Sequence, residues 1–250
     1  MATTQHYLWA GGHFLLLACS LKYLVSWALF RGPSPVWYKT SFLGALVSYA
    51  IVCHKSLGTP KPNAGWFKRA MMDENVQYFV LAFFWWTSKP IALALLPYAV
   101  FSLFHALTFT RTTLMPQILP PGPPGASGAP TPHPLAKQLQ SWVKTNYDTA
   151  MKAVAFIELI IMARVFLGAL TFRNSLMTPL FYAHFLRQRY YQSQFTRIAV
   201  TSVKGRAEEY VRKPGSPPIL AQIWDKFTMI VERWAGSTLA PQQPAQAGGQ

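Results

Sequence analysis

The chain has 250 residues, of which 51% are hydrophobic and only 12% carry a charge. Soluble domains average about 25% charged residues, so this composition argues against an ordinary water-soluble protein. Mean hydropathy is only +0.17, so the apolar residues must be gathered in segments. The net charge of +15 fits an anionic membrane surface or nucleic acid. In a chain this apolar we expect membrane lipids as the partner and no direct nucleic-acid binding.

The first two apolar segments cover residues 8–30 and 36–53, and residues 31–35 (Arg-Gly-Pro-Ser-Pro) break the helix between them. The first segment exceeds the roughly 20 residues that cross a bilayer. The second begins with Trp37 and Tyr38, which favour the membrane interface. Because the connection is short, the two helices must be antiparallel neighbours. The sequence therefore predicts a first helical hairpin.

A polar stretch with four lysines and arginines, residues 54–75, is expected on the cytosolic side. Residues 76–110 are the most apolar part of the chain, interrupted once by Ser-Lys-Pro at 88–90, which predicts a turn. The arm before this turn, residues 76–87, is too short to cross about 30 Å of hydrocarbon. It either dips into the membrane and returns, or lies in the interface beside one crossing helix at 91–110.

A Pro/Gly-rich stretch, residues 116–134, is predicted to be a flexible linker. A basic helix leads from it into an apolar segment at 150–172, and a shorter apolar segment, 177–186, is either a return arm or an interfacial helix. Two topologies fit this pattern. Three hairpins place every basic loop in the cytosol, whereas four crossings place the linker in the lumen.

The predicted fold class is all-α, with polytopic membrane helices arranged as hairpins plus C-terminal amphipathic helices. The predicted divisions are N-terminal membrane hairpins (1–115), a Pro/Gly-rich linker (116–134), a second membrane region (135–186), a basic and amphipathic cytosolic tail (187–235) and a disordered end (236–250).

The tail contains an amphipathic helix over residues 216–236, with Ser216 as the expected N-cap, Pro217 at the first helical position and Gly236 at the stop. Acidic and basic residues cancel on its polar face, so membrane binding must come from burying the apolar face. Such helices favour curved membranes, where lipid packing is defective. The alternative is that this face packs on the protein itself or on a partner helix. Eight apolar residues fall within about 140° of the helical wheel: Ile219, Leu220, Ile223, Trp224, Phe227, Ile230, Val231 and Trp234.

A basic segment precedes this helix, and only Glu208 and Glu209 oppose it. We expect it to contact anionic lipid or an acidic protein partner. Its basic residues are Arg187, Arg189, Arg197, Lys204, Arg206, Arg212 and Lys213.

Ionisable residues inside apolar runs are functional candidates by default. Here they are Lys22, His105, Glu158 and Arg164. Glu158 and Arg164 lie six residues apart, about 120° around a helix, so each should pair with another helix. We expect structural roles; the alternative is a small membrane transporter or lipid-handling protein that uses Glu158, Arg164 and His105. The sequence has no catalytic motif, no metal-ligand spacing and no cofactor motif, so we expect neither an enzyme nor a bound metal or cofactor.

Two stretches resemble the small pore-membrane and ER protein family, that is, the fungal Pom/Per/Tts group and its animal relative, transmembrane protein thirty-three. The first runs from residues 71–75 (Met-Met-Asp-Glu-Asn) to 101–110 (Phe-Ser-Leu-Phe-His-Ala-Leu-Thr-Phe-Thr). The second begins at 179–186 (Pro-Leu-Phe-Tyr-Ala-His-Phe-Leu) and continues through Arg189 and Tyr190 to Arg197. The likeness covers most of residues 8–213.

The resemblance implies a non-enzymatic, multi-pass protein of the endoplasmic reticulum membrane, nuclear envelope and nuclear pore, with a cytosolic tail. It also implies association with reticulon-type ER shapers, nucleoporins and an import receptor. Our hypothesis is a protein that shapes or senses membrane curvature and supports nuclear pore complex distribution or assembly. Short hairpins would wedge the cytosolic leaflet, and the tail helix would bind curved membrane.

Overall fold

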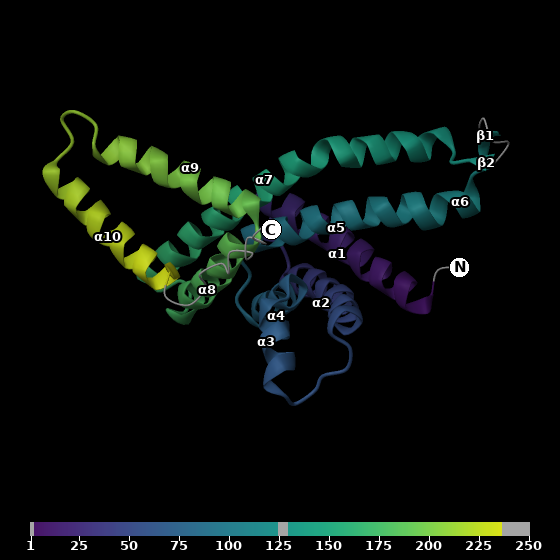
Figure 1. Ribbon diagram of the computed structural model, residues 1–250, viewed down its shortest axis with the longest axis horizontal. Helices are drawn as coiled ribbons and strands as arrows, with labels where there is room; N and C mark the ends of the chain where they lie inside the picture. Colours follow the sequence, from purple (N-terminus) through teal and green to yellow (C-terminus); the bar gives the residue numbers. More distant parts are fainter. Residues whose placement is uncertain (1–2, 125–129, 237–250) are drawn as a thin grey trace, which may run out of the picture. The chain divides into compact units, whose positions relative to one another are not determined.

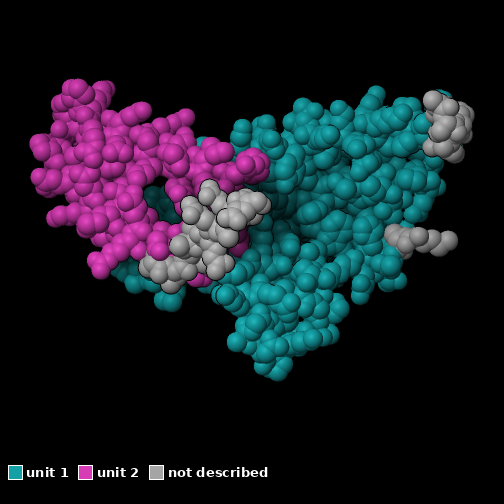
Figure 2. Space-filling model, in the orientation of Figure 1, with its two compact units in different colours: residues 1–182 teal, residues 183–250 magenta. Residues whose placement is uncertain are grey.

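The structure is a computed structural model that describes residues 3–124 and 130–236, and helices make up most of it (Figure 1). It divides into two compact units, residues 1–182 and 183–250, which are described separately (Figure 2). The all-α prediction is confirmed, and the predicted disordered end beyond Gly236 lies outside the described residues. The helices of the first unit are α1 (Thr4–Ala28), α2 (Pro35–Leu57), α3 (Ala64–Met72), α4 (Glu74–Thr87), the 3-10 turn η1 (Ala92–Ala94), α5 (Leu95–Phe109), the π-helical turn η2 (Thr110–Leu114), α6 (Met115–Ile118) and α7 (Pro134–Leu170). Helix α8 (Met177–Gln192) begins in the first unit, and the second unit holds α9 (Gln194–Val211) and α10 (Pro218–Gly236).

Four helical stretches among the described residues are long and apolar enough to cross a membrane, namely α1, α2, the continuous run Ala92–Ile118 and α7. Two shorter helices, α4 and α8, accompany them. Helix α4 has 14 residues and is therefore only about 21 Å long, less than the hydrocarbon thickness of a bilayer.

The predicted first hairpin is present, and small residues let α1 and α2 approach closely. A Cβ added to Gly12 would lie 2.7 Å from the carbonyl oxygen of Gly44, and one added to Gly44 would lie 2.6 Å from the carbonyl oxygen of Gly12. Beside this crossing the hydroxyl of Ser48 donates to the carbonyl of Trp9 at 2.8 Å. Small residues with an interhelical hydrogen bond are typical of helix packing in membranes.

Helix α4 runs antiparallel to α2. Near the start of α4 the ring of Tyr78 stacks on Tyr49 of α2, with centroids 5.9 Å apart. At the end of α4 the ammonium of Lys39 donates to the carbonyl of Ser88 at 2.9 Å and also to that of Trp86. These carbonyls have no partner within α4, so the lysine of α2 completes the end of the short helix.

Helix α5 runs antiparallel to α1. The rings of His6 and Phe109 lie 5.0 Å apart, whereas Nδ1 of His13 is 2.9 Å from the hydroxyl oxygen of Ser102. In a chain of four successive crossings, the first and third helices would run parallel. The opposite direction arises because α4 carries the chain back before α5 begins. Of the two topologies left open by the sequence, this arrangement fits the hairpin topology.

Helix α7 reverses direction again, since Phe104 of α5 lies against Trp142 and Tyr147 near the start of α7. The turn η1 contacts both α1 and α7, and Phe84 near the end of α4 stacks on Phe181 near the start of α8. The connections 29–34, 88–91 and 171–176 therefore lie toward one end of the first unit, which we call the apical end. The start of α1, helix α3 and the described residues 119–124 and 130–133 lie toward the other, basal end.

Part of the predicted Pro/Gly-rich linker lies within the described residues. Strand β1 (Gly122–Pro124) pairs with β2 (Pro130–Thr131) in an antiparallel ladder, with Gly122 opposite Thr131. The hydroxyl of Thr131 donates to the carbonyl of Pro123 at 2.7 Å. Prolines and glycines disfavour a helix here, and the described residues form two short paired strands instead.

Candidate functional site

In the second unit α9 and α10 form an antiparallel helical pair that contains most of the predicted site residues. The amphipathic helix starts at Pro218, slightly later than predicted. The physical reason lies at Ser216, whose hydroxyl donates to the carbonyl of Tyr210 at 3.1 Å instead of capping the new helix. Gly236 ends the helix as predicted.

The apolar face of α10 is open to the surroundings. No residue of this helix is buried, and seven of the eight predicted apolar residues are exposed, from 37% for Leu220 to 63% for Ile230. The eighth, Trp224, is half-buried and contacts the ring of Phe227 at 5.8 Å between centroids. Packing of this face onto the protein's membrane region or onto a partner helix, the alternative considered from the sequence, stays a prediction.

The acidic residues of α10 point to α9. A guanidinium nitrogen of Arg212 lies 2.6 Å from the carboxylate of Asp225, and the ammonium of Lys204 lies 2.5 Å from that of Glu232. Arg212 also bonds Glu208, one turn earlier on its own helix. Hydrogen bonds to these carboxylates raise the pKa of Lys204 and of Arg212 above their ordinary values. All these side chains are largely exposed, so the ion pairs are individually weak and sensitive to salt.

The C-terminal end of α10 is held by the end of α8. The guanidinium of Arg187 lies over the ring of Trp234, 5.2 Å from its centroid, and its Nε donates to the carbonyl of Ala235 at 3.2 Å. The hydroxyl of Tyr191 donates to the same carbonyl at 2.8 Å. These donors satisfy a backbone acceptor that the helix itself cannot pair.

The predicted basic residues thus divide by role. Arg187, Lys204 and Arg212 hold α10, and Arg197 donates to the carbonyl of Tyr191 at 3.1 Å. Arg189 is buried, only 6% exposed, so it does not share the surface expected for the basic set. The remaining two, Arg206 and Lys213, are exposed, and their side chains have no ion-pair partner within the described residues.

The structure brings the basic segment and the amphipathic helix into one site, although the sequence treats them as separate. A signal for this was present. Lys204 and Arg212 are eight residues apart, and Asp225 and Glu232 are seven apart, so each pair lies two turns apart on one side of its helix. When two helices run antiparallel, the two basic residues of one can therefore lie opposite the two acidic residues of the other.

The ionisable residues of the membrane segments have three different sets of neighbours. Glu158 is fully buried and accepts a hydrogen bond from the hydroxyl of Tyr78 on α4 at 2.7 Å, so it does bond another helix as expected. The ring of His105 lies 4.6 Å from that of His13. Arg164 lies beside Gly168 on its own helix. The transporter alternative, which would use His105, Glu158 and Arg164, stays a prediction.

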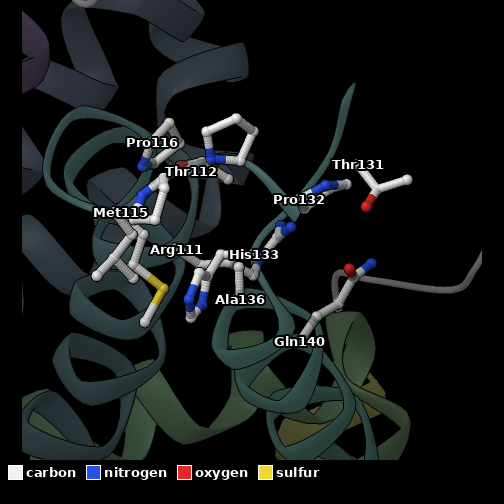
Figure 3. Close-up of a pocket in the computed structure, with 12 residues that line it drawn as sticks. Arg111, Thr112, Met115, Pro116, Thr131, Pro132, His133, Ala136 and Gln140 are labelled. Carbon is white, nitrogen blue, oxygen red and sulfur yellow. The ribbon is translucent and has the colours of Figure 1, made fainter. Parts of the chain in front are cut away.

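A cavity of about 560 Å³ lies between α6 and the start of α7 (Figure 3). The hydroxyl of Thr112 donates to the carbonyl of Thr108, and Nδ1 of His133 accepts from the amide of Leu135. No carboxylate or thiol lines this cavity. Within the described residues no group of three or more His, Cys, Asp or Glu side chains could hold a metal ion.

The fold and these surfaces define a polytopic helical membrane protein whose helix α10 has no buried residue. The chain belongs to the Transmembrane protein 33/Nucleoporin POM33 family, whose model matches residues 1–237. The resemblance inferred from the sequence is thereby confirmed.

Three relatives illustrate the family. Nucleoporin POM33 of Chaetomium thermophilum is 34% identical over 95% of this chain and 88% of its own length. Tetra-spanning protein 1 of Schizosaccharomyces pombe is 33% identical over 95% of this chain and 86% of its own length. Human Transmembrane protein 33 is 21% identical over 83% of this chain and 78% of its own length. None of these names denotes an enzyme, and no solved structure matches the chain.

Proposed function

We propose that this chain is a non-enzymatic protein of the endoplasmic reticulum and nuclear envelope that shapes or senses membrane curvature and supports nuclear pore complex distribution or assembly. The exposed apolar face of α10 carries the proposal. The acidic residues on the polar side of α10, Asp225 and Glu232, form ion pairs with Arg212 and Lys204. The face left open is therefore the apolar one, and a membrane surface is the environment that removes it from water.

The energetics favour insertion over charge attraction. Fully burying one large apolar side chain contributes about 1.5–3 kcal/mol, and an interfacial helix sinks about 5–10 Å into the headgroup boundary. Taken alone, α10 has no net charge, because Lys226 and Arg233 balance its two acidic residues, so the helix itself gains little from attraction to anionic lipid. Binding that depends on apolar burial is strongest where lipid packing is loose, as on curved membranes.

The names of the relatives support the proposed location. One relative is named as a nucleoporin and another as a pore membrane protein, the latter from Saccharomyces cerevisiae. We propose membrane lipids as the first partner, with nucleoporins, reticulon-type ER shapers and an import receptor as protein partners. The exposed Arg206 and Lys213 suit an acidic partner. Lysines and arginines concentrate at the basal end and in the tail, which supports a cytosolic tail.

The test compares Phe227→Glu with Met229→Glu in the full-length protein. Both side chains are exposed, 55% and 61%, and both variants add one negative charge to the same helix, but the two residues lie on opposite sides of it. The protein is reconstituted in fluorescent vesicles of about 30–200 nm, a range spanning strong to weak curvature, and its density is measured against vesicle size.

Wild type and Met229→Glu should be several-fold denser on the smallest vesicles, whereas Phe227→Glu should lose most of this enrichment. Equal enrichment of all three proteins would show that α10 does not sense curvature.

A further inference from the structure

The apical end of the first unit has an unusual composition. Each of its three connections carries one basic residue, Arg31, Lys89 or Arg173, and none contains an aspartate or glutamate. All three basic side chains are exposed. Lys89 is not needed to complete the end of α4, because Lys39 of α2 already bonds the last carbonyls of that helix.

Two of these connections share the same backbone conformation. Phe30 and Phe172 each have φ of 55°, and they are the non-glycine residues with positive φ in the described chain. Each follows the end of a long helix closely and precedes an arginine whose amide closes the helix. The amide of Arg31 donates to Ser26 at 2.9 Å, and that of Arg173 donates to Gly168 at 2.7 Å. Glycine usually occupies this left-handed position, because a bulky side chain is strained there.

The strained phenylalanines pack on almost nothing within the protein. Phe30 is 97% exposed and Phe172 is 89% exposed. Their surfaces continue those of the helices they follow, since Val25 on α1 and Leu170 on α7 are also exposed apolar residues at the same ends. A strained, exposed aromatic ring at the end of a membrane helix points to a ligand outside the chain.

We propose that the apical end is a phospholipid-binding face. Arg31, Lys89 and Arg173 bind lipid phosphates in the leaflet farther from the basal end, and the rings of Phe30 and Phe172 enter the acyl chains below those phosphates. Cations at this end could not remain in hydrocarbon, whereas phosphate groups accept their hydrogen bonds. This goes beyond the proposed function, in which α10 contacts the cytosolic surface. It also differs from the hypothesis that short hairpins wedge only the cytosolic leaflet, because here the hairpin ends reach the far leaflet.

The short helix α4 gives this proposal a physical consequence. Its roughly 21 Å must connect the basal end to the same apical surface that the longer helices reach. A hydrophobic stretch shorter than the bilayer is accommodated by local thinning of the bilayer. The lipids that the apical residues bind are therefore those of a thinned patch around α4.

One experiment establishes whether the apical end reaches the far side. Single cysteines are introduced by Ser34→Cys, Ser175→Cys or Thr131→Cys into a full-length chain carrying Cys19→Ser and Cys53→Ser, in sealed microsomes. We expect an impermeant maleimide to label Thr131→Cys directly, and Ser34→Cys and Ser175→Cys only after the membrane is permeabilised. Labelling of Ser175→Cys without permeabilisation would overturn the proposal, and so would failure of both apical cysteines to react after permeabilisation.

A second experiment tests lipid binding itself. The full-length protein is reconstituted with a phospholipid that carries a photoreactive group near its phosphate, and the cross-linked peptides are mapped by mass spectrometry. Cross-links should concentrate in residues 29–34 and 171–176 and should persist when inorganic phosphate is added. Competition by inorganic phosphate alone, or cross-links equally spread over the helices, would contradict a lipid site.

The variant pair Phe30→Gly with Phe172→Gly separates lipid binding from a structural role. Glycine suits the left-handed position, so a merely structural role predicts equal or higher thermal stability and unchanged cross-linking. We expect stability to be kept and apical cross-linking to fall several-fold. Ile118→Gly, which removes an exposed apolar residue (75% exposed) at the basal end, should leave the cross-links unchanged. Unchanged apical cross-linking in the double glycine variant would overturn the role of the rings.

Discussion

Glu158 places a carboxyl group in the interior of the membrane region, where a polar group needs hydrogen-bond partners. It is fully buried on α7, and the hydroxyl of Tyr78 donates to it from α4. The carbonyl of Tyr78 in turn accepts from the hydroxyl of Tyr98 on α5 at 2.9 Å. Buried polar groups are costly unless they are hydrogen-bonded, so this chain of two bonds ties three helices together at one point.

Removing the hydroxyl of Tyr78 should therefore be costly. We expect Tyr78→Phe to destabilise the protein by about 1–3 kcal/mol, because the carboxyl group of Glu158 loses a donor where water does not replace it. The measurement is the thermal unfolding midpoint of the purified full-length protein in detergent. Tyr23→Phe is the control, since Tyr23 is also buried but its hydroxyl has no hydrogen-bond partner in the described part of the chain. Equal shifts for the two variants would contradict this account.

At the scale of elements, two helix pairs show opposite ways of holding helices together. Helices α1 and α2 pack backbone against backbone at Gly12 and Gly44, which leaves no room for even one added carbon. Helices α9 and α10 are joined by ion pairs between exposed side chains, which water and salt weaken. The first pair is therefore expected to be rigid, whereas the second can separate under mild changes of conditions.

Adjacent glycines in α1 provide a test of the first pair. Gly12→Ala should destabilise the protein by about 1–3 kcal/mol, because its Cβ would lie 2.7 Å from the backbone oxygen of Gly44. Gly11→Ala should be neutral or stabilise by up to about 1 kcal/mol, because nothing lies within 4 Å and alanine favours helix. Thermal unfolding in detergent checks both, and a stabilised Gly12→Ala would show that the helices are not closely packed.

Charge reversal tests the second pair. Arg212→Glu should move α10 away from α9, since the new carboxylate would face Asp225 and Glu208, and adding Asp225→Arg should restore the contact. The distance between spin labels on the two helices of the full-length protein measures this. The wild-type distance should also broaden at high salt.

The direction in which the pKa of Lys204 is shifted determines how the α9–α10 contact depends on pH. Because pairing with Glu232 raises the pKa of Lys204, the stabilisation that this ion pair gives to the α9–α10 contact is fully present below the ordinary pKa of 10.5. It is lost as pH rises through the raised pKa.

A distance distribution unaffected by the charge reversal of Arg212 would show that the ion pairs do not hold α10.

At the scale of the whole molecule, local signals predicted most of the elements and contacts distant in sequence decided their arrangement. The prolines around Ser34 and the lysine–proline pair at Lys89 marked helix ends correctly, because they act on the backbone at their own positions. The direction of α5 could not be obtained in this way, because it depends on α4 returning along α2. The joining of the basic segment to α10 was also missed, since the spacing of Lys204 and Arg212 on one helix and of Asp225 and Glu232 on the next permits the pairing but does not show that the two helices meet.

The shortness of α4 has a consequence for how the protein is made. The carbonyls at the end of α4 accept hydrogen bonds from Lys39, which is synthesised before α4. The hydroxyl of Tyr78 on α4, however, donates to the carboxylate of Glu158, which is synthesised 80 residues later. Chains grow from the N-terminus at about 5–20 residues per second, so α4 leaves the ribosome seconds before α7 can receive it. Until then a helix too short to cross a bilayer lacks one of the contacts that hold it there. Its final place in the membrane is therefore set late in biosynthesis, when α7 arrives.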